Sequence, residues 1–241
     1  MSVEDQAGVE RRRSPLLIST LILGLLVLLV VLVARFYTDY LWFSSVSAST
    51  VFTTQLAARV GLFLGFGLLM GGGVFGSLAL AYRLRPPVRR ANLDSELLLQ
   101  LRDNLDRRSR ILMLLPSTVA GLLGGGVAAG QMQVFLAWVR STDFGTSDAV
   151  FGLDASFYVF QLPWWRFVLN YVSFMVVVCL MGALLVHFLT GAMNSRAFRK
   201  SGNLKGAGKA AQRQVSILLG VTLLLYGIAS FLDRYGYLTT Q

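Results

Sequence analysis

The side chains of this sequence that could carry chemistry are few, and they form no recognisable catalytic pair. His187 is the only histidine and Cys179 the only cysteine among the 241 residues. A proton-coupled carrier needs a carboxylate or histidine relay inside the membrane, and only His187 could serve. Its place near the end of an apolar run favours an interfacial or helix-bonded histidine instead. A lone cysteine excludes an intrachain disulfide and a cysteine zinc cluster. We therefore expect no enzyme, no catalytic residue and no cofactor.

Three aspartates in one segment, Asp143, Asp148 and Asp154, could be calcium ligands, because carboxylates supply hard oxygen atoms. Their spacings of five and six residues do not match the acidic pattern of an EF-hand loop. We expect these carboxylates to cap helices or turns, and we predict no metal site.

A glycine-rich basic segment, residues 202–209, superficially resembles a phosphate-binding loop. It lacks the G-x-x-x-x-G-K-[ST] pattern, and no strand precedes it. We expect a flexible basic loop that faces lipid headgroups.

The elements that must position these residues are apolar helices. The sequence is 55% hydrophobic and 14% charged, with a mean hydropathy of +0.62. Soluble domains carry about 25% charged residues, so this composition excludes most soluble folds. A bilayer needs about 20 apolar residues per helix, and we predict an all-α bundle of five transmembrane spans with these bounds: 16–34, 60–82, 111–138, 167–193 and 215–232.

Basic residues predict how the chain crosses the membrane. Cytoplasmic loops collect lysine and arginine, and these residues concentrate in the tail 1–15 and in the loops 83–110 and 194–214. The loops 35–59 and 139–166 hold few. We therefore expect a cytoplasmic N-terminus, an extracytoplasmic C-terminus and a single bundle domain, 16–241. The net charge of +10 then faces anionic lipid headgroups on the cytoplasmic side, and nucleic acid is not the expected partner.

The loops carry further signals. Aromatic residues between Tyr37 and Phe52 are typical of headgroup anchors in a loop before the second span. Leucines between Leu97 and Leu105 recur at helical spacing and predict a short amphipathic helix, either on the inner membrane surface or packed under the bundle.

Glycines crowd the second and third spans. Small residues four apart let helix backbones approach closely. We expect helix packing at several such pairs, with a dimer face or a substrate path as the alternative: Gly61 and Gly65, Gly67 and Gly71, Gly72 and Gly76, Gly121 and Gly125, Gly126 and Gly130.

The outer loop after the third span is too apolar to lie free in water. We expect it to cover the outer ends of the spans, with the loop from Tyr37 to Phe52 as its partner, or else to dock another protein. The candidate residues for either role are Phe151, Gly152, Asp154, Phe157, Tyr158 and Pro163. Gly152 would permit a turn, and Asp154 would cap the short helix or turn after it. If Phe157 is a buried packing residue, Phe157→Ala costs about 3–5 kcal/mol of stability.

Three segments resemble one bacterial family of integral membrane proteins. They are 39–43 (DYLWF), 148–163 (DAVFGLDASFYVFQLP) and 231–235 (FLDRY). Together they are similar to the N-terminal membrane part of the uncharacterised protein family UPF0182. That resemblance implies longer proteins with about seven spans and a large extracytoplasmic region. It also implies a multi-pass protein of the bacterial plasma (inner) membrane. It implies no catalytic residue, because the family has no established activity.

Two functions remain after these exclusions. The first is a structural, assembly or anchoring module of the cell envelope that holds an extracytoplasmic domain or protein partner. The alternative is a transporter or channel subunit that uses the glycine-rich second and third spans. A water-filled cavity lined by polar groups between spans would favour the alternative.

Overall fold

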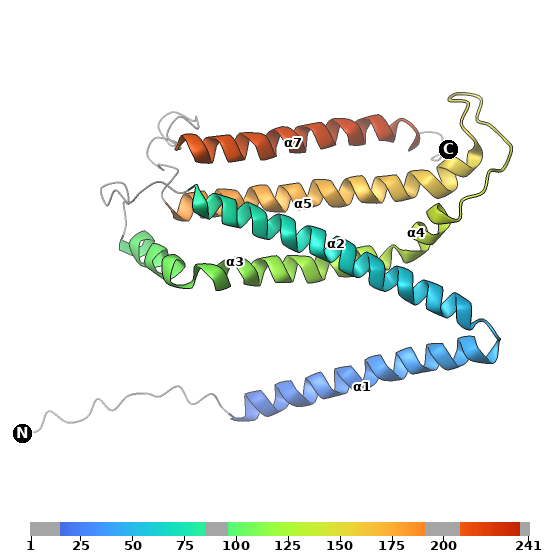
Figure 1. Ribbon diagram of the computed structural model, residues 1–241, viewed down its shortest axis with the longest axis horizontal. Helices are drawn as coiled ribbons and strands as arrows, with labels where there is room; N and C mark the ends of the chain where they lie inside the picture. The colour runs from blue at the N-terminus through green and yellow to red at the C-terminus, as the bar shows by residue number, and fades with distance from the viewer. Residues whose placement is uncertain (1–14, 85–95, 191–207, 237–241) are drawn as a thin grey trace, which may run out of the picture. The chain divides into compact units, whose positions relative to one another are not determined.

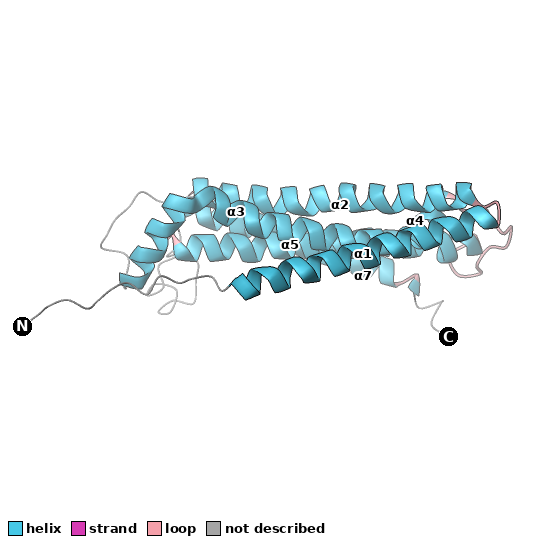
Figure 2. Cartoon of the chain, turned by 90° about the horizontal axis from the view of Figure 1, so that it is seen from below, coloured by secondary structure: helices cyan, strands magenta, loops and turns pink. Residues whose placement is uncertain are grey.

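The computed structural model describes residues 15–84, 96–190 and 208–236. Figure 1 shows that most of these residues lie in helices, and Figure 2 shows the same chain without a strand in the described part. The elements, in chain order, are α1 (Pro15–Ser45), α2 (Ser49–Arg83), α3 (Glu96–Gly130), α4 (Met132–Val139), η2 (Phe157–Gln161), α5 (Leu162–Leu189) and α7 (Lys209–Asp233). The all-α prediction is confirmed.

Among the described residues, five stretches are helical, long and apolar enough to cross a membrane. A helix satisfies its own backbone hydrogen bonds, which lipid cannot do. The described part of the chain therefore has one helix of sufficient length and hydropathy for each of the five predicted spans. Their bounds are Ile22–Ser45, Ser49–Arg83, Ser109–Gly130, Phe157–Leu189 and Lys209–Asp233.

The prediction of an outer loop at residues 35–59 is wrong. α1 continues to Ser45 and α2 begins at Ser49, so only a tight turn separates them. Ser47 takes a positive φ of 57° in that turn. Neither glycine nor proline interrupts residues 35–45, so aromatic and polar side chains extend the helix beyond the apolar run.

The third span is shorter than predicted. Its helix α3 ends at Gly130, Gln131 forms a turn, and α4 follows as a separate short helix. At the other end, α3 begins at Glu96, so the predicted helix around Leu97–Leu105 is the first part of α3 and not a separate element. The side chains of residues 85–108 lie outside the described part.

The predicted basic loop 194–214 lies mostly outside the described residues. Its last part is helical, because α7 begins at Lys209 and has Gly208 as its N-cap residue. The predicted tail 1–15 also lies outside the described residues, except that Pro15 begins α1. Pro suits the first turn of a helix, where its missing N–H leaves no carbonyl unpaired.

Contacts divide the chain into two compact units, Met1–Leu56 and Ala57–Gln241, where the sequence predicted one bundle domain. In the first unit, Phe52 packs against the rings of Phe36, Tyr40 and Phe43, with centroid distances of 5.5, 5.8 and 5.7 Å. These aromatic pairs hold the helical hairpin at its tip. The candidate sites all lie in the second unit.

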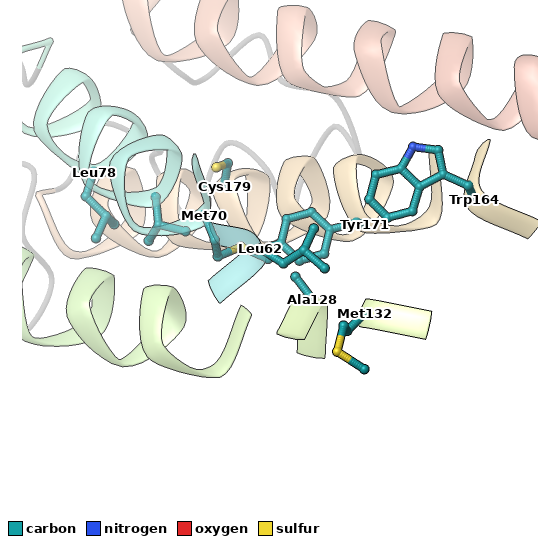
Figure 3. Packing of buried hydrophobic residues seen from close by; sticks show 9 residues of the cluster. Leu62, Met70, Leu78, Ala128, Met132, Trp164, Tyr171 and Cys179 are labelled. Carbon is teal, nitrogen blue, oxygen red and sulfur yellow. The ribbon is translucent and has the colours of Figure 1, made fainter. Parts of the chain in front are cut away.

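The core of the second unit lies among α2, α3, α4 and α5, and Figure 3 shows its side chains. Met70 on α2 is 2% exposed, and Ala128 on α3 is fully buried. Trp164 and Tyr171 extend the core along α5. Trp164 stacks on Trp138 of α4 at 5.4 Å, with ring planes 20° apart. This aromatic end of the core lies next to the loop that joins α4 to η2, and so fixes the base of that loop.

Candidate functional site

The loop between α4 and η2 is a folded structure held by two carboxylates. Asp154 accepts hydrogen bonds from the backbone N–H groups of Phe144 (3.1 Å), Gly145 (2.8 Å) and Ser156 (2.8 Å). Asp148 accepts them from Val150 (3.1 Å) and Phe151 (2.7 Å). A carboxylate that binds backbone donors in this way replaces the missing secondary structure of a loop.

Backbone pairing completes the loop. Ser147 and Asp154 form an isolated antiparallel bridge. Beside this bridge, Asp148 donates its N–H to Leu153 O at 2.8 Å, and Ala155 donates to Thr146 O at 2.9 Å. Gly152 has a φ of +67°. Because L side chains rarely adopt that conformation, glycine at 152 suits the turn that reverses the chain.

The hydrogen bonds to Asp154 lower its pKa from the usual 3.8 to about 2. The largest contribution is the Ser156 side chain, followed by the backbone N–H groups of Ser156 and Phe144. The pKa of Asp148 is also lowered, chiefly by the backbone N–H of Phe151. Both carboxylates are therefore ionised near neutral pH, and both are engaged as acceptors within the loop.

Tyr235, just after α7, packs against aromatic residues of the loop and of η2. Its ring lies 4.9 Å from that of Phe151, 5.6 Å from Phe157 and 6.5 Å from Tyr158. Tyr158 in turn donates its hydroxyl to Asp148 at 3.1 Å. From the sequence, we predicted that residues 37–52 pack against this loop. Within the second unit, the residue that packs against it is Tyr235.

The candidate loop residues occupy different positions. Phe157 and Tyr158 are half-buried on η2, a π-helical stretch of the kind often found at functional sites. Pro163 lies in the first turn of α5. Phe151 is 36% exposed, and Val150 beside it is 67% exposed. The loop therefore packs on one face and presents apolar side chains on the other.

The predicted packing glycines divide into two groups. A Cβ at Gly121 would lie 2.9 Å from Gly67 O, and one at Gly125 would lie 2.6 Å from Phe63 O. A Cβ at Gly71 would lie 3.1 Å from Ser117 O. Here the α2 and α3 backbones approach as closely as glycine allows, which is the close packing expected of small residues four apart.

The second group consists of Gly61, Gly65, Gly72, Gly76, Gly126 and Gly130. A Cβ at each would meet nothing within 4 Å in the described part of the chain. Because one residue corresponds to about 100° of helix rotation, these glycines lie outside the close contact between the α2 and α3 backbones. A spacing of four therefore does not by itself identify the face that meets another helix.

A groove of about 1040 Å³ lies between α3 and α5. Toward the end nearest the loop it is lined by the polar side chains of Gln131, Tyr158 and Arg166, and Asn170 lies about halfway along its α5 wall. Its deeper part is lined by apolar residues such as Val119, Leu123, Phe174 and Val178. The groove is thus polar at one end and apolar along its length.

Arg166 is the charged group of this groove. It lies 3.5 Å from the Asp233 carboxylate on α7. Its Nε atom is buried and has no hydrogen-bond partner. Gly236 lies against the guanidinium, so closely that a Cβ at 236 would overlap it. No role was predicted for Arg166 from the sequence, although a single arginine at the start of an apolar run was a visible signal.

His187 belongs to a buried polar cluster that joins three helices. Its Nε2 atom lies 2.9 Å from Gln214 Oε1 on α7. Gln214 donates through Nε2 to Ser77 O on α2 at 3.0 Å, and the Ser77 hydroxyl donates to Cys179 O on α5 at 2.9 Å. His187 is fully buried. Gln214 was missed from the sequence, where it stands in the predicted loop and not on a helix face.

In the described part of the chain, no group of three or more His, Cys, Asp or Glu side chains could hold a metal ion. His187 and Cys179 are both buried. Among the described residues, neither side chain is hydrogen-bonded to a hydroxyl or a carboxylate. Within the described ranges these two side chains therefore form no nucleophile–base pair.

Comparison with known proteins identifies relatives along almost the whole chain. A family model described as "Uncharacterised protein family (UPF0182)" matches residues 16–241. The UPF0182 protein of Streptomyces coelicolor is 38% identical over 226 residues, which cover 94% of this chain and 22% of the relative. That of Mycobacterium tuberculosis is 36% identical over 230 residues, or 95% of this chain and 22% of the relative. That of Thermobifida fusca is 36% identical over 203 residues, or 84% of this chain and 19% of the relative.

The chain therefore spans about a fifth of the length of these curated relatives. No solved structure matches it.

Proposed function

This chain belongs to the uncharacterised protein family UPF0182, and from that premise we propose that it is a membrane-anchoring and assembly module of the bacterial cell envelope. The module holds the loop 140–156 as a docking surface for an extracytoplasmic domain or protein partner. It acts without catalysis, as a multi-pass protein of the plasma membrane.

The observation that carries this proposal is that the loop is fixed internally while it exposes apolar side chains. Asp148 and Asp154 bind its backbone, and Tyr235 packs against its aromatic residues. Phe144 is nevertheless 51% exposed and Val150 is 67% exposed. A loop that is fixed internally and apolar outside loses little conformational entropy on binding, which favours a docking role.

The distribution of basic residues supports an orientation for the module. We place the N-terminus in the cytoplasm and the loop 140–156 outside, because lysine and arginine are enriched in the segments 1–15, 83–110 and 194–214. These segments then lie against anionic headgroups on the cytoplasmic face. The loop 140–156 would meet partners outside the cytoplasm.

The rival function is a transporter or channel subunit built on the glycine-rich spans. A path between α2 and α3 would need space where Gly67, Gly121 and Gly125 meet the opposite backbone. The close contacts there favour packing over a path. The groove between α3 and α5 is mostly apolar, which suits a hydrated pathway poorly.

Photocrosslinking in cells tests the docking role. A photoreactive residue at Phe144 or Val150 should capture the same protein, and the same residue at Leu224, a 71% exposed position on α7, should not. Adding Val150→Asp to the Phe144 variant should abolish capture while thermal unfolding in detergent stays unchanged. Capture of the same species from Leu224, or lipid adducts alone from both loop positions, would contradict the proposal.

A further inference from the structure

We propose that the groove between α3 and α5 binds one membrane phospholipid, with its phosphate at Arg166 and an acyl chain along the apolar part. The inference rests on how polarity is distributed in the groove. Gln131, Tyr158 and Arg166, which include its one charged side chain, lie toward the end near the loop, whereas the deeper lining has no charged residue. A phospholipid has the same division between headgroup and chain.

The dimensions of the groove suit this ligand. From Leu162 to Val178 the lining follows α5 for about 24 Å at 1.5 Å per residue. Half of a bilayer's hydrocarbon core is about 15 Å, so one acyl chain can lie in the groove over its full length. The volume of about 1040 Å³ is at the upper end of that of small-molecule pockets.

Arg166 lies at the depth of a lipid phosphate. The helical stretch Phe157–Leu189 has 33 residues, more than the roughly 20 that span the hydrocarbon core. The uncharged run of α5 starts directly after Arg166, at Phe167. Placing that run in the hydrocarbon core puts the guanidinium at the headgroup boundary on the side of the loop 140–156.

The contacts of Arg166 leave it able to bind an anion. Asp233, its ion-pair partner, has a 66% exposed side chain and lies 3.5 Å away, so water screens this pair. The Arg166 side chain is 35% exposed, so a phosphate oxygen can reach it, and its buried Nε has no acceptor among the described residues. Gly236 provides room for the guanidinium where any side chain would displace it.

Native mass spectrometry of the full chain tests this site. The protein is purified in detergent, stripped of lipid and titrated with phosphatidylglycerol. We expect one tightly bound lipid for the wild type. Arg166→Gln should weaken its binding roughly 10-fold, the effect of losing one charge-assisted hydrogen bond. Val127→Trp, which fills the groove, should abolish binding of that lipid.

Two control variants separate the site from general effects. Arg140→Gln removes an exposed arginine that does not line the groove, and Leu224→Trp adds the same indole at an exposed position on α7. Both should bind lipid as the wild type does. Thermal unfolding of each lipid-free variant shows whether it remains folded, and a variant that unfolds is replaced by Arg166→Met or Val127→Phe.

Three outcomes would overturn the proposal. The first is equal retention of lipid by all variants, which means only general annular lipid. The second is competition by glycerol phosphate as effective as that by the lipid, which means a free phosphate site. The third is capture of protein and not lipid by a photoreactive residue at Val127, which means that another helix occupies the groove. None of these results bears on the loop crosslinks that test the docking role.

Discussion

Nε2 of His187 and Oε1 of Gln214 lie 2.9 Å apart, and this contact joins α5 to α7 inside the apolar bundle. Gln214 extends the connection to α2 through its bond to Ser77 O. Because lipid and apolar side chains offer no substitute partners, each group depends on the others. The cluster therefore fixes how the three helices are rotated relative to one another.

We predict that His187→Leu lowers the free energy of unfolding by about 1–3 kcal/mol, because it leaves the Gln214 amide buried without its partner. The double variant His187→Leu/Gln214→Leu should recover part of this loss. Thermal unfolding in detergent measures both. Gln212→Leu, at an exposed position two residues away, is the matched control and should have little effect. Additive losses in the double variant would contradict coupling between the two side chains.

The glycine contacts between α2 and α3 predict opposite effects for adjacent substitutions. Gly125→Ala should destabilise by about 1–3 kcal/mol, because the new Cβ would lie 2.6 Å from a backbone oxygen. Gly126→Ala should be neutral or slightly stabilising, because nothing lies within 4 Å and alanine favours helix. Thermal unfolding of the two variants tests this prediction. A larger loss at 126 than at 125 would show that α3 is rotated differently.

Phe157→Ala should destabilise the bundle by about 1–3 kcal/mol, less than the 3–5 kcal/mol of a fully buried aromatic site. The reason is that Phe157 is half-buried, with its ring packed against those of Tyr158 and Tyr235. A double-mutant cycle with Tyr235→Ala should show a coupling energy of about 0.5–1.5 kcal/mol. Thr146→Ala is the control on the same loop, and it should keep the stability of the wild type. No coupling in the cycle would exclude the Tyr235 contact.

The loop 140–156 should lose order in acid. Asp154 has a folded-state pKa of about 2 against the usual 3.8, so its carboxylate stabilises the loop above about pH 4. That stabilisation is lost as pH falls from about 4 toward about 2, because protonation then becomes easier in the unfolded loop than in the folded one. Hydrogen exchange of the Gly145 and Ser156 amides measures it. Asp154→Asn should remove this pH dependence, and an unchanged profile would contradict the assignment.

Much of this fold can be predicted from short-range patterns in the sequence. Five unbroken apolar runs predict helices in lipid, because a helix satisfies its own backbone groups and barrel strands would alternate apolar with polar residues. Aspartates next to glycines in a short segment predict turns, and Asp148, Gly152 and Asp154 do lie in the turns of the loop. These properties depend on neighbours within a few residues, so sequence alone determined them.

The tertiary structure decided what each helix face meets. Gly72 and Gly71 look alike in sequence, yet only a Cβ at Gly71 would contact the α3 backbone, because one residue rotates the contact by about 100°. Tyr235 contacts Phe151 across a long stretch of chain, and Gln214 reaches His187 from the next helix. Such pairings follow from the rotation and relative height of whole helices. Those depend on the packing of all the helices together, and no short segment of the sequence encodes them.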